Sequence, residues 1–173
     1  MERMLWLDLE MTGLDIEKEV IIEVAAIVTD KSLEPIDTYH AVVKQPDEYL
    51  RNMDEWNTTH HGQSGLTALV PDGKEPQLVE RELMEFCEKN FPNDEKIVLA
   101  GNSIFQDRIF INKYFKHLKD MLHYRMLDVT TFKLIFNNFY QISYAKQPSR
   151  HRALDDIQDS INELKKYLSF IEL

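Results

Sequence analysis

Two carboxylates separated by one residue stand near the start of the chain, at the end of a short apolar segment. Residues 4–9 read Met-Leu-Trp-Leu-Asp-Leu, which is typical of a β-strand, and Asp8 and Glu10 lie at its end. Side chains alternate between the two faces of a strand, so both carboxylates lie on one face and together can hold a hard cation. An isolated Asp-x-Glu more often belongs to a solvent-facing edge strand, so this motif alone is a weak signal.

A third acid, Asp107, follows the apolar stretch 97–101, with Asn102 and Ser103 between them. Open α/β sheets often gather catalytic groups beyond the ends of their strands, where a helix begins. The ordinary structural interpretation is that Asp107 is one more polar residue in a first helical turn and that Asn102 or Ser103 is only a cap.

The last candidates are His151 and Asp156, which lie at the start of the final helix-like segment. His151 falls in the preceding connection and Asp156 about one turn inside the helix, so the two side chains can converge on one point. Taken separately, a histidine before a helix is usually exposed, and Asp155 and Asp156 together complement the helix dipole.

Together these side chains have the composition of a site that cleaves phosphodiesters. Hydrolysis with two cations needs several carboxylates that hold the metals about 4 Å apart, and a base for the attacking water. The oxygen ligands suit Mg²⁺ or Mn²⁺ and come from four acids: Asp8, Glu10, Asp107 and Asp156. A histidine titrates near neutral pH, which suits His151 for the general base.

The elements that must position these groups follow from the hydrophobic pattern. Strands are predicted at 4–9, 20–29, 36–43, 97–101 and 124–128, and helices at 76–91, 104–115, 129–140 and 152–171. The turn at 31–35 is too short for a helical crossover, so the second and third strands are predicted to be antiparallel. This order predicts an α/β fold with a mixed sheet, and 173 residues fit a single domain over residues 1–173.

Composition limits the partners and the compartment. The net charge of −10 argues against a protein that grips a long polynucleotide or a long duplex, because that affinity comes mainly from Lys and Arg on phosphates. The single cysteine, Cys87, lies in a helical run and is predicted to be a buried thiol, which fits a reducing cytoplasm. No apolar run reaches 18 residues, so we expect no membrane span.

The motifs resemble the three signatures of the DEDDh exonucleases. They occur in order as Asp8-Leu9-Glu10, then 102–107 (Asn-Ser-Ile-Phe-Gln-Asp), then 151–156 (His-Arg-Ala-Leu-Asp-Asp). The likeness narrows to the oligoribonuclease family through residues 6–14, 56–66 and 123–130, and it covers nearly the whole chain. It implies a ribonuclease-H-like fold with a mixed sheet flanked by helices, a homodimer, and hydrolysis of short RNA from the 3′ end to 5′-mononucleotides.

The resemblance also implies roles for individual residues. One metal would be held by Asp8, Glu10 and Asp156 and the other chiefly by Asp8, with Asp107 near the second site and His151 activating the water. The implied substrate contacts lie at seven positions: Leu14 and Trp56 at the bases with His61 beside them, Tyr124 from the partner subunit, and Ser103, Arg125 and Thr130 at the 5′ phosphate of a dinucleotide.

Several of these residues also have ordinary structural interpretations. Trp56 would be a core aromatic, Tyr124 part of a buried strand, and Arg125 the partner of a nearby acid. His60 and His61 are adjacent, so their side chains point in different directions and a shared metal is improbable. The chain also departs from the family pattern after Thr130, because the basic stretch expected in the next helix is mostly apolar here.

Two alternative functions remain open from the sequence. One is a broader DEDDh exonuclease that acts on longer RNA or single-stranded DNA, which activity against substrates of increasing length would distinguish. The other is a catalytically silent scaffold that binds nucleic acid or a protein. Tight binding of an oligonucleotide without turnover in saturating Mn²⁺ would favour the scaffold.

Overall fold

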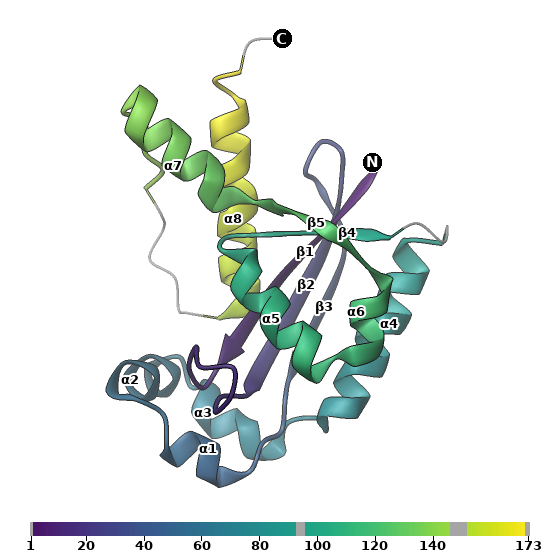
Figure 1. The fold of residues 1–173 in the computed structure, drawn as a ribbon, viewed down its shortest axis with the longest axis vertical. Helices are drawn as coiled ribbons and strands as arrows, with labels where there is room; N and C mark the ends of the chain where they lie inside the picture. Colours follow the sequence, from purple (N-terminus) through teal and green to yellow (C-terminus); the bar gives the residue numbers. More distant parts are fainter. Residues whose placement is uncertain (1, 93–95, 146–151, 172–173) are drawn as a thin grey trace.

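The structure of the protein is a computed structural model that describes residues 2–92, 96–145 and 152–171. Its centre is a five-stranded sheet with the strand order β3-β2-β1-β4-β5 (Figure 1). The strands are β1 (Arg3–Met11), β2 (Ile21–Asp30), β3 (Pro35–Val42), β4 (Ile97–Gly101) and β5 (Leu122–Asp128). β2 pairs antiparallel with both β1 and β3, whereas β4 runs parallel to β1 and β5. The predicted mixed sheet is therefore confirmed.

Helices follow the strands in the order the sequence predicted, with additional short ones. The helices are α1 (Asp47–Arg51), α2 (Glu55–Gln63), α3 (Leu66–Leu69), the 3₁₀ helix η1 (Val70–Asp72), α4 (Pro76–Asn90), α5 (Ile104–Tyr114), α6 (Lys116–Met121), α7 (Val129–Tyr140) and α8 (Ala153–Leu168). The sequence predicted α4, α5, α7 and α8 to within a few residues. It missed α1–α3, η1 and α6, because elements of three to nine residues are too short to show a helical period.

The alternation of side chains along β1 divides the interior into two cores. Leu5, Leu7 and Leu9 pack with residues of α4, α5 and α6, whereas Met4 and Trp6 pack on the opposite face with α8. The α8 side of this second core is the stripe Ala153, Ile157, Ile161 and Leu164, whose spacing of three and four residues is that of one helix face. Because Asp8 and Glu10 continue the register of Met4 and Trp6, they lie on the α8 face of the sheet.

One end of the sheet collects the segments that carry the predicted site. Figure 1 shows the arrowhead of β1, the start of α8 and the small helices α1–α3 at this end.

Cys87 is fully buried in α4, as predicted, and burial raises the pKa of its thiol to about 12. Among the described residues, no helix combines the length and the apolar character needed to cross a membrane.

Candidate active site

The carboxylates of β1 lie in the interior of the sheet. β1 is the middle strand, paired with β2 along its length and with β4 on the other side, so the interpretation of Asp8 and Glu10 as solvent-facing edge residues is wrong. Asp8 pairs in register with Ala25 and Glu10 with Glu23. The Glu10 side chain is 17% exposed, which leaves it a narrow opening to solvent at the end of the strand.

α8 brings a third carboxylate to the same place. Asp156 is the fourth residue of this helix, and its amide bonds to the carbonyl of Arg152 at 3.1 Å in the first turn. One oxygen from each of Asp8, Glu10 and Asp156 lies within 4.8 Å of the others. Two of the three sequence motifs therefore meet at one point, although they are almost 150 residues apart in the chain.

The charge at this point is concentrated enough to alter the chemistry of Glu10. Burial, followed by the neighbouring charges of Asp156, Glu23 and Asp107, raises the pKa of Glu10 to about 8. A divalent cation between the carboxylates would reverse this effect, because it stabilises the ionised form. The set of hard oxygen donors and their separation both fit a hard divalent cation.

Glu23 supports this site, and the sequence interpretation missed it. Its fully buried carboxylate accepts hydrogen bonds from His40 Nε2 at 2.7 Å, Arg152 Nε at 2.8 Å and the Ala153 amide at 3.1 Å. Burial alone would raise its pKa, but these donors outweigh burial and lower the pKa to about 2. Glu23 thus ties β2 to the first residues of α8. The signal available was a glutamate inside an apolar strand, which needs a partner.

Asp107 is close to the other acids but lies apart from the three-carboxylate cluster. It is buried in the first turn of α5, and its Oδ1 accepts a hydrogen bond of 2.9 Å from the amide of Leu9, the residue between Asp8 and Glu10. Burial raises its pKa, against the effect of this hydrogen bond. Asp107 therefore approaches the strand backbone, with its charge near enough to act on Glu10.

The predicted base, His151, lies outside the described residues. The next residue in the chain, Arg152, is described, and its guanidinium bonds to Glu23. The start of α8 is therefore fixed to β2 one residue after His151.

The residues predicted to contact bases divide into exposed and buried side chains. Leu14 is 71% exposed and Trp56 is 57% exposed, so the interpretation of Trp56 as a core aromatic is wrong. His60 stacks on Trp56 with a centroid distance of 3.9 Å. His61 is buried, where its Nε2 donates to the Met11 carbonyl at 2.9 Å and its Nδ1 lies 4.0 Å from Glu10 Oε2. The two histidines point in different directions, as predicted.

Two of the residues predicted to contact the 5′ phosphate lie just beyond the ends of β4 and β5: Ser103 before α5 and Thr130 in the first turn of α7. These strands end side by side, since Gly101 pairs with Asp128. Ser103 Oγ lies 3.1 Å from Thr130 Oγ1, so the structure brings these two predicted residues together. Tyr124 and Arg125 lie on the edge strand β5, where the Arg125 guanidinium sits 5.3 Å from the centre of the Tyr124 ring. Tyr124 is 75% exposed, so its interpretation as a buried residue is wrong.

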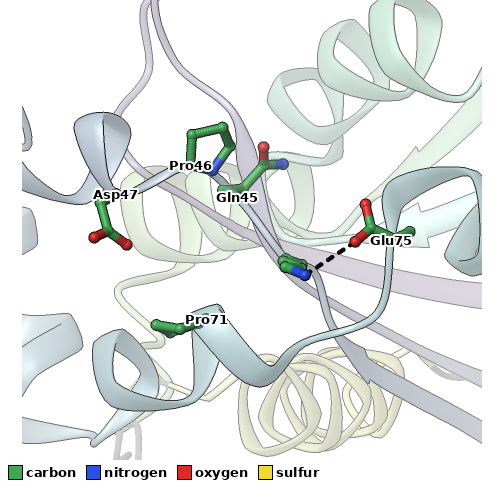
Figure 2. A pocket seen from close by; sticks show the side chains of 6 residues that line it. Gln45, Pro46, Asp47, Pro71 and Glu75 are labelled. Atoms are coloured by element: carbon green, nitrogen blue, oxygen red, sulfur yellow. Dashed lines mark ion pairs between the residues drawn. The ribbon is translucent and has the colours of Figure 1, made fainter.

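A surface pocket of about 370 Å³ lies apart from these residues (Figure 2). It lies among the segments that join β3 to α1 and η1 to α4, and its lining residues are Lys44, Gln45, Pro46, Asp47, Pro71 and Glu75. The dashed line in Figure 2 is the ion pair of 3.2 Å between Lys44 and Glu75. None of the predicted site residues lines this pocket, so it has no part in the carboxylate site.

Comparison with known proteins agrees with this geometry. A family model described as an exonuclease, RNase T, matches residues 5–164. The oligoribonuclease of Francisella tularensis subsp. tularensis (strain WY96-3418) is 45% identical over 173 residues, which cover 96% of this chain and 94% of the relative. The human protein named oligoribonuclease, mitochondrial, is 43% identical over 171 residues, which cover 96% of this chain and 72% of the relative.

Solved structures share the fold at lower identity. A zinc-bound complex of E. coli ExoI with single-stranded DNA has a TM-score of 0.74 and 13% identity, over 95% of this chain and 40% of that one. Exonuclease I from Methylocaldum szegediense has a TM-score of 0.72 and 15% identity, over 98% of this chain and 41% of that one. This chain spans about two fifths of those proteins, and the likeness confirms the expected ribonuclease-H-like fold. The family match and the oligoribonuclease relatives show that the chain belongs to the exonuclease family and, within it, to the oligoribonucleases.

Proposed function

We propose that the protein is a 3′→5′ exoribonuclease that hydrolyses short oligoribonucleotides, above all diribonucleotides, to 5′-mononucleotides. The observation that carries the proposal is the convergence of Asp8, Glu10 and Asp156 within 4.8 Å of one another. That donor set occurs in a chain 45% identical to an oligoribonuclease over nearly its full length.

The proposed chemistry uses two divalent cations, Mg²⁺ or Mn²⁺. Asp8, Glu10 and Asp156 would hold one of them and Asp8 would hold the second, with Asp107 beside it. When bound, the cations polarise the scissile phosphate and lower the pKa of the attacking water. His151 takes the proton of that water. Asp107, through its bond to the Leu9 amide, keeps the end of β1 in place between the two ligands.

The proposed base contacts are Leu14 and Trp56, with His61 beside them. Exposed apolar and aromatic side chains offer faces on which unpaired bases stack, at about 1–3 kcal/mol per base. The loop that carries Leu14 is fixed to α5, since Gln106 Nε2 donates to the Leu14 carbonyl at 3.1 Å and Lys113 Nζ bonds to the Ile16 carbonyl. A loop whose backbone is held in this way loses little conformational freedom when a base binds against it.

Ser103, Arg125 and Thr130 are the proposed contacts of the 5′ phosphate. A small set of placed donors at the far end of the substrate would block longer chains and needs no basic track along the protein. A net charge of −10 is compatible with that kind of site, because few phosphates have to be neutralised.

The proposed assembly is a homodimer in which Tyr124 enters the partner's site. Support comes from the position of Tyr124, which is 75% exposed on an edge strand and is flanked by the ring of His123 at 4.5 Å. An exposed aromatic on an unpaired sheet edge is suited to contact another chain.

We further propose that residues 1–173 form one domain. The cytoplasmic location stays a prediction of the sequence, and the human and bovine relatives are named as mitochondrial.

The direct test is turnover of a 5′-phosphorylated diribonucleotide by the purified protein with Mg²⁺ or Mn²⁺. The expected products are 5′-mononucleotides, and His151→Ala should nearly abolish their formation while Mn²⁺ still binds. An inactive wild-type protein that binds the dinucleotide tightly would contradict the proposal and favour a silent scaffold.

A further inference from the structure

A continuous chain of hydrogen bonds joins α8 to the loop that follows β4. Asn102 is its central residue, with its amide nitrogen toward α8 and its amide oxygen toward α7. Asn102 Nδ2 donates to Ser160 Oγ at 2.9 Å and to Glu163 Oε2 at 3.0 Å. The two hydrogens of the amide are thus both used on α8, one turn beyond Asp156 at Ser160 and two turns beyond it at Glu163.

The two acceptors on α8, Ser160 and Glu163, fix the side-chain amide of Asn102 in a single orientation. Glu163 is fully buried, and its other oxygen accepts a hydrogen bond of 3.0 Å from Tyr167 Oη. The hydroxyl of Ser160 donates its proton to the Asp156 carbonyl at 2.8 Å, so toward Asn102 it can only accept. A flipped amide would place its oxygen against two acceptors inside the protein, which is costly for buried groups.

The fixed amide determines how Thr130 and Ser103 are held. Thr130 Oγ1 donates to Asn102 Oδ1 at 3.3 Å and accepts from the Ser103 amide at 2.9 Å. Asp128 Oδ1 accepts from the amides of both Ser103 and Thr130, each at 2.9 Å. These bonds hold Ser103 at φ 52°, a left-handed conformation that a serine adopts only when its surroundings impose it.

From this arrangement we propose that Glu163 is a positioning residue for binding of the substrate's 5′ phosphate. It acts through Asn102, whose orientation directs the Thr130 proton to its amide oxygen and leaves Thr130 Oγ1 as an acceptor for the Ser103 amide. Ser103 is thereby held in its left-handed conformation, with its hydroxyl at the proposed phosphate site. The inference rests on the proposed function and deepens it, because it assigns specificity for a 5′-phosphorylated end to a buried carboxylate that does not touch the substrate.

The test compares two diribonucleotides that differ only in a 5′ phosphate or a 5′ hydroxyl, with wild type and Glu163→Gln. Glutamine keeps the size of the side chain but replaces one carboxylate oxygen with a donor, so Asn102 no longer faces two groups that can only accept and its orientation is fixed less strongly. We expect KM for the phosphorylated substrate to rise about tenfold, the effect of one lost hydrogen bond to a charged group. The kcat for this substrate and both constants for the hydroxyl substrate should stay within about twofold.

Tyr167→Phe supplies a second variant, because it removes one donor from Glu163 and leaves the carboxylate. Its KM effect should have the same sign and be smaller. Glu34→Gln is the matched control. Glu34 lies between β2 and β3 and pairs at 2.7 Å with Lys165, a surface residue of α8 that has no part in this chain of hydrogen bonds. It should change neither substrate's constants.

Failure of the positioning role and failure of the proposed function would give different results. If both variants are folded by circular dichroism and raise KM equally for the two substrates, or leave it unchanged, the positioning role is wrong while the proposed function stands. If the wild type does not cleave either dinucleotide, the proposed function itself is wrong.

Discussion

At the scale of single residues, the proposed metal site depends on which carboxylates lie close enough together to share a cation and which only lie nearby. Asp155 and Asp156 are adjacent in α8, yet Asp155 is exposed and Asp156 joins Asp8 and Glu10. The sequence could not distinguish a dipole-complementing pair from a metal ligand, because both interpretations place acids in a first helical turn. In the structure, the position of the helix against β1 brings Asp156 within 4.8 Å of Asp8 and Glu10, which supports the proposed ligand role for Asp156.

This difference predicts unequal effects of one substitution at two neighbouring positions. Asp156→Asn should lower kcat on the order of a thousandfold, about 4 kcal/mol in the barrier, because the cluster loses a charged ligand. Asp155→Asn, its matched control, should stay within about twofold of wild type. Steady-state kinetics with Mn²⁺ measures both, and equal losses would show that Asp156 has no special role.

The raised pKa of Glu10 gives a prediction for the metal-free protein. A carboxyl whose pKa rises from 4.5 unfolded to about 8 folded binds its proton more tightly in the native state. Its contribution to the free energy of unfolding is therefore full below about pH 4.5 and is lost as the pH rises through 8. In EDTA, thermal unfolding of wild type should shift to lower temperature across this window, and Glu10→Gln should reduce the shift. An undiminished shift in Glu10→Gln would assign the effect to other groups.

At the scale of elements, the placement of α8 decides whether the sequence motifs meet. The helix is fixed near its start by the Glu23–Arg152 bond and near its end by the exposed pair of Glu34 and Lys165. Long amphipathic elements such as α4 and α8 were predictable from periodicity alone. The short α2 was not, because it is polar along most of its length and shows no apolar stripe. Its start is marked only by Asp54, the N-cap residue, whose side chain accepts from the Asn57 amide at 2.8 Å.

The two ends of α8 should differ in their contribution to stability. Arg152→Met removes the cation that faces a fully buried Glu23 and should lower the free energy of unfolding by about 3 kcal/mol. Lys165→Met breaks a solvent-exposed pair and should cost less than about 0.5 kcal/mol. Urea unfolding of both variants, monitored by circular dichroism, compares them directly. Similar costs would mean that Glu23 does not hold the start of the helix.

At the scale of the whole molecule, the sequence predicted the fold and the family but not the hydrogen-bond networks that hold the site together. The order of strands and helices gave the mixed sheet, and the resemblance gave the family, but neither indicated the network of Glu23 or that of Asn102 and Glu163. Those networks include partners that are far apart in the chain, 61 positions for Asn102 and Glu163 and 130 positions for Glu23 and Ala153. Such partners become visible only when the sheet register and the helix packing are known.

The proposed dimer predicts that two inactive variants can restore each other. Tyr124→Ala removes the side chain that would enter the partner's site, and Asp8→Ala removes a metal ligand from its own site. A hybrid dimer would contain one site with both intact side chains, up to half the wild-type number. Mixed and re-equilibrated protomers should regain diribonucleotide hydrolysis. Demonstrably mixed dimers without activity would contradict a trans-acting Tyr124.

The central claim is that the carboxylate site serves the shortest RNAs, and one measurement tests it most directly. It is kcat/KM for 5′-phosphorylated oligoribonucleotides of increasing length, from two residues upward, with Mg²⁺ and with Mn²⁺. A phosphate-binding site at the far end of a dinucleotide predicts the highest value at two residues and a steep fall beyond a few. A value that is constant or rises with length, or equal activity on single-stranded DNA, would contradict the account and indicate a broader exonuclease.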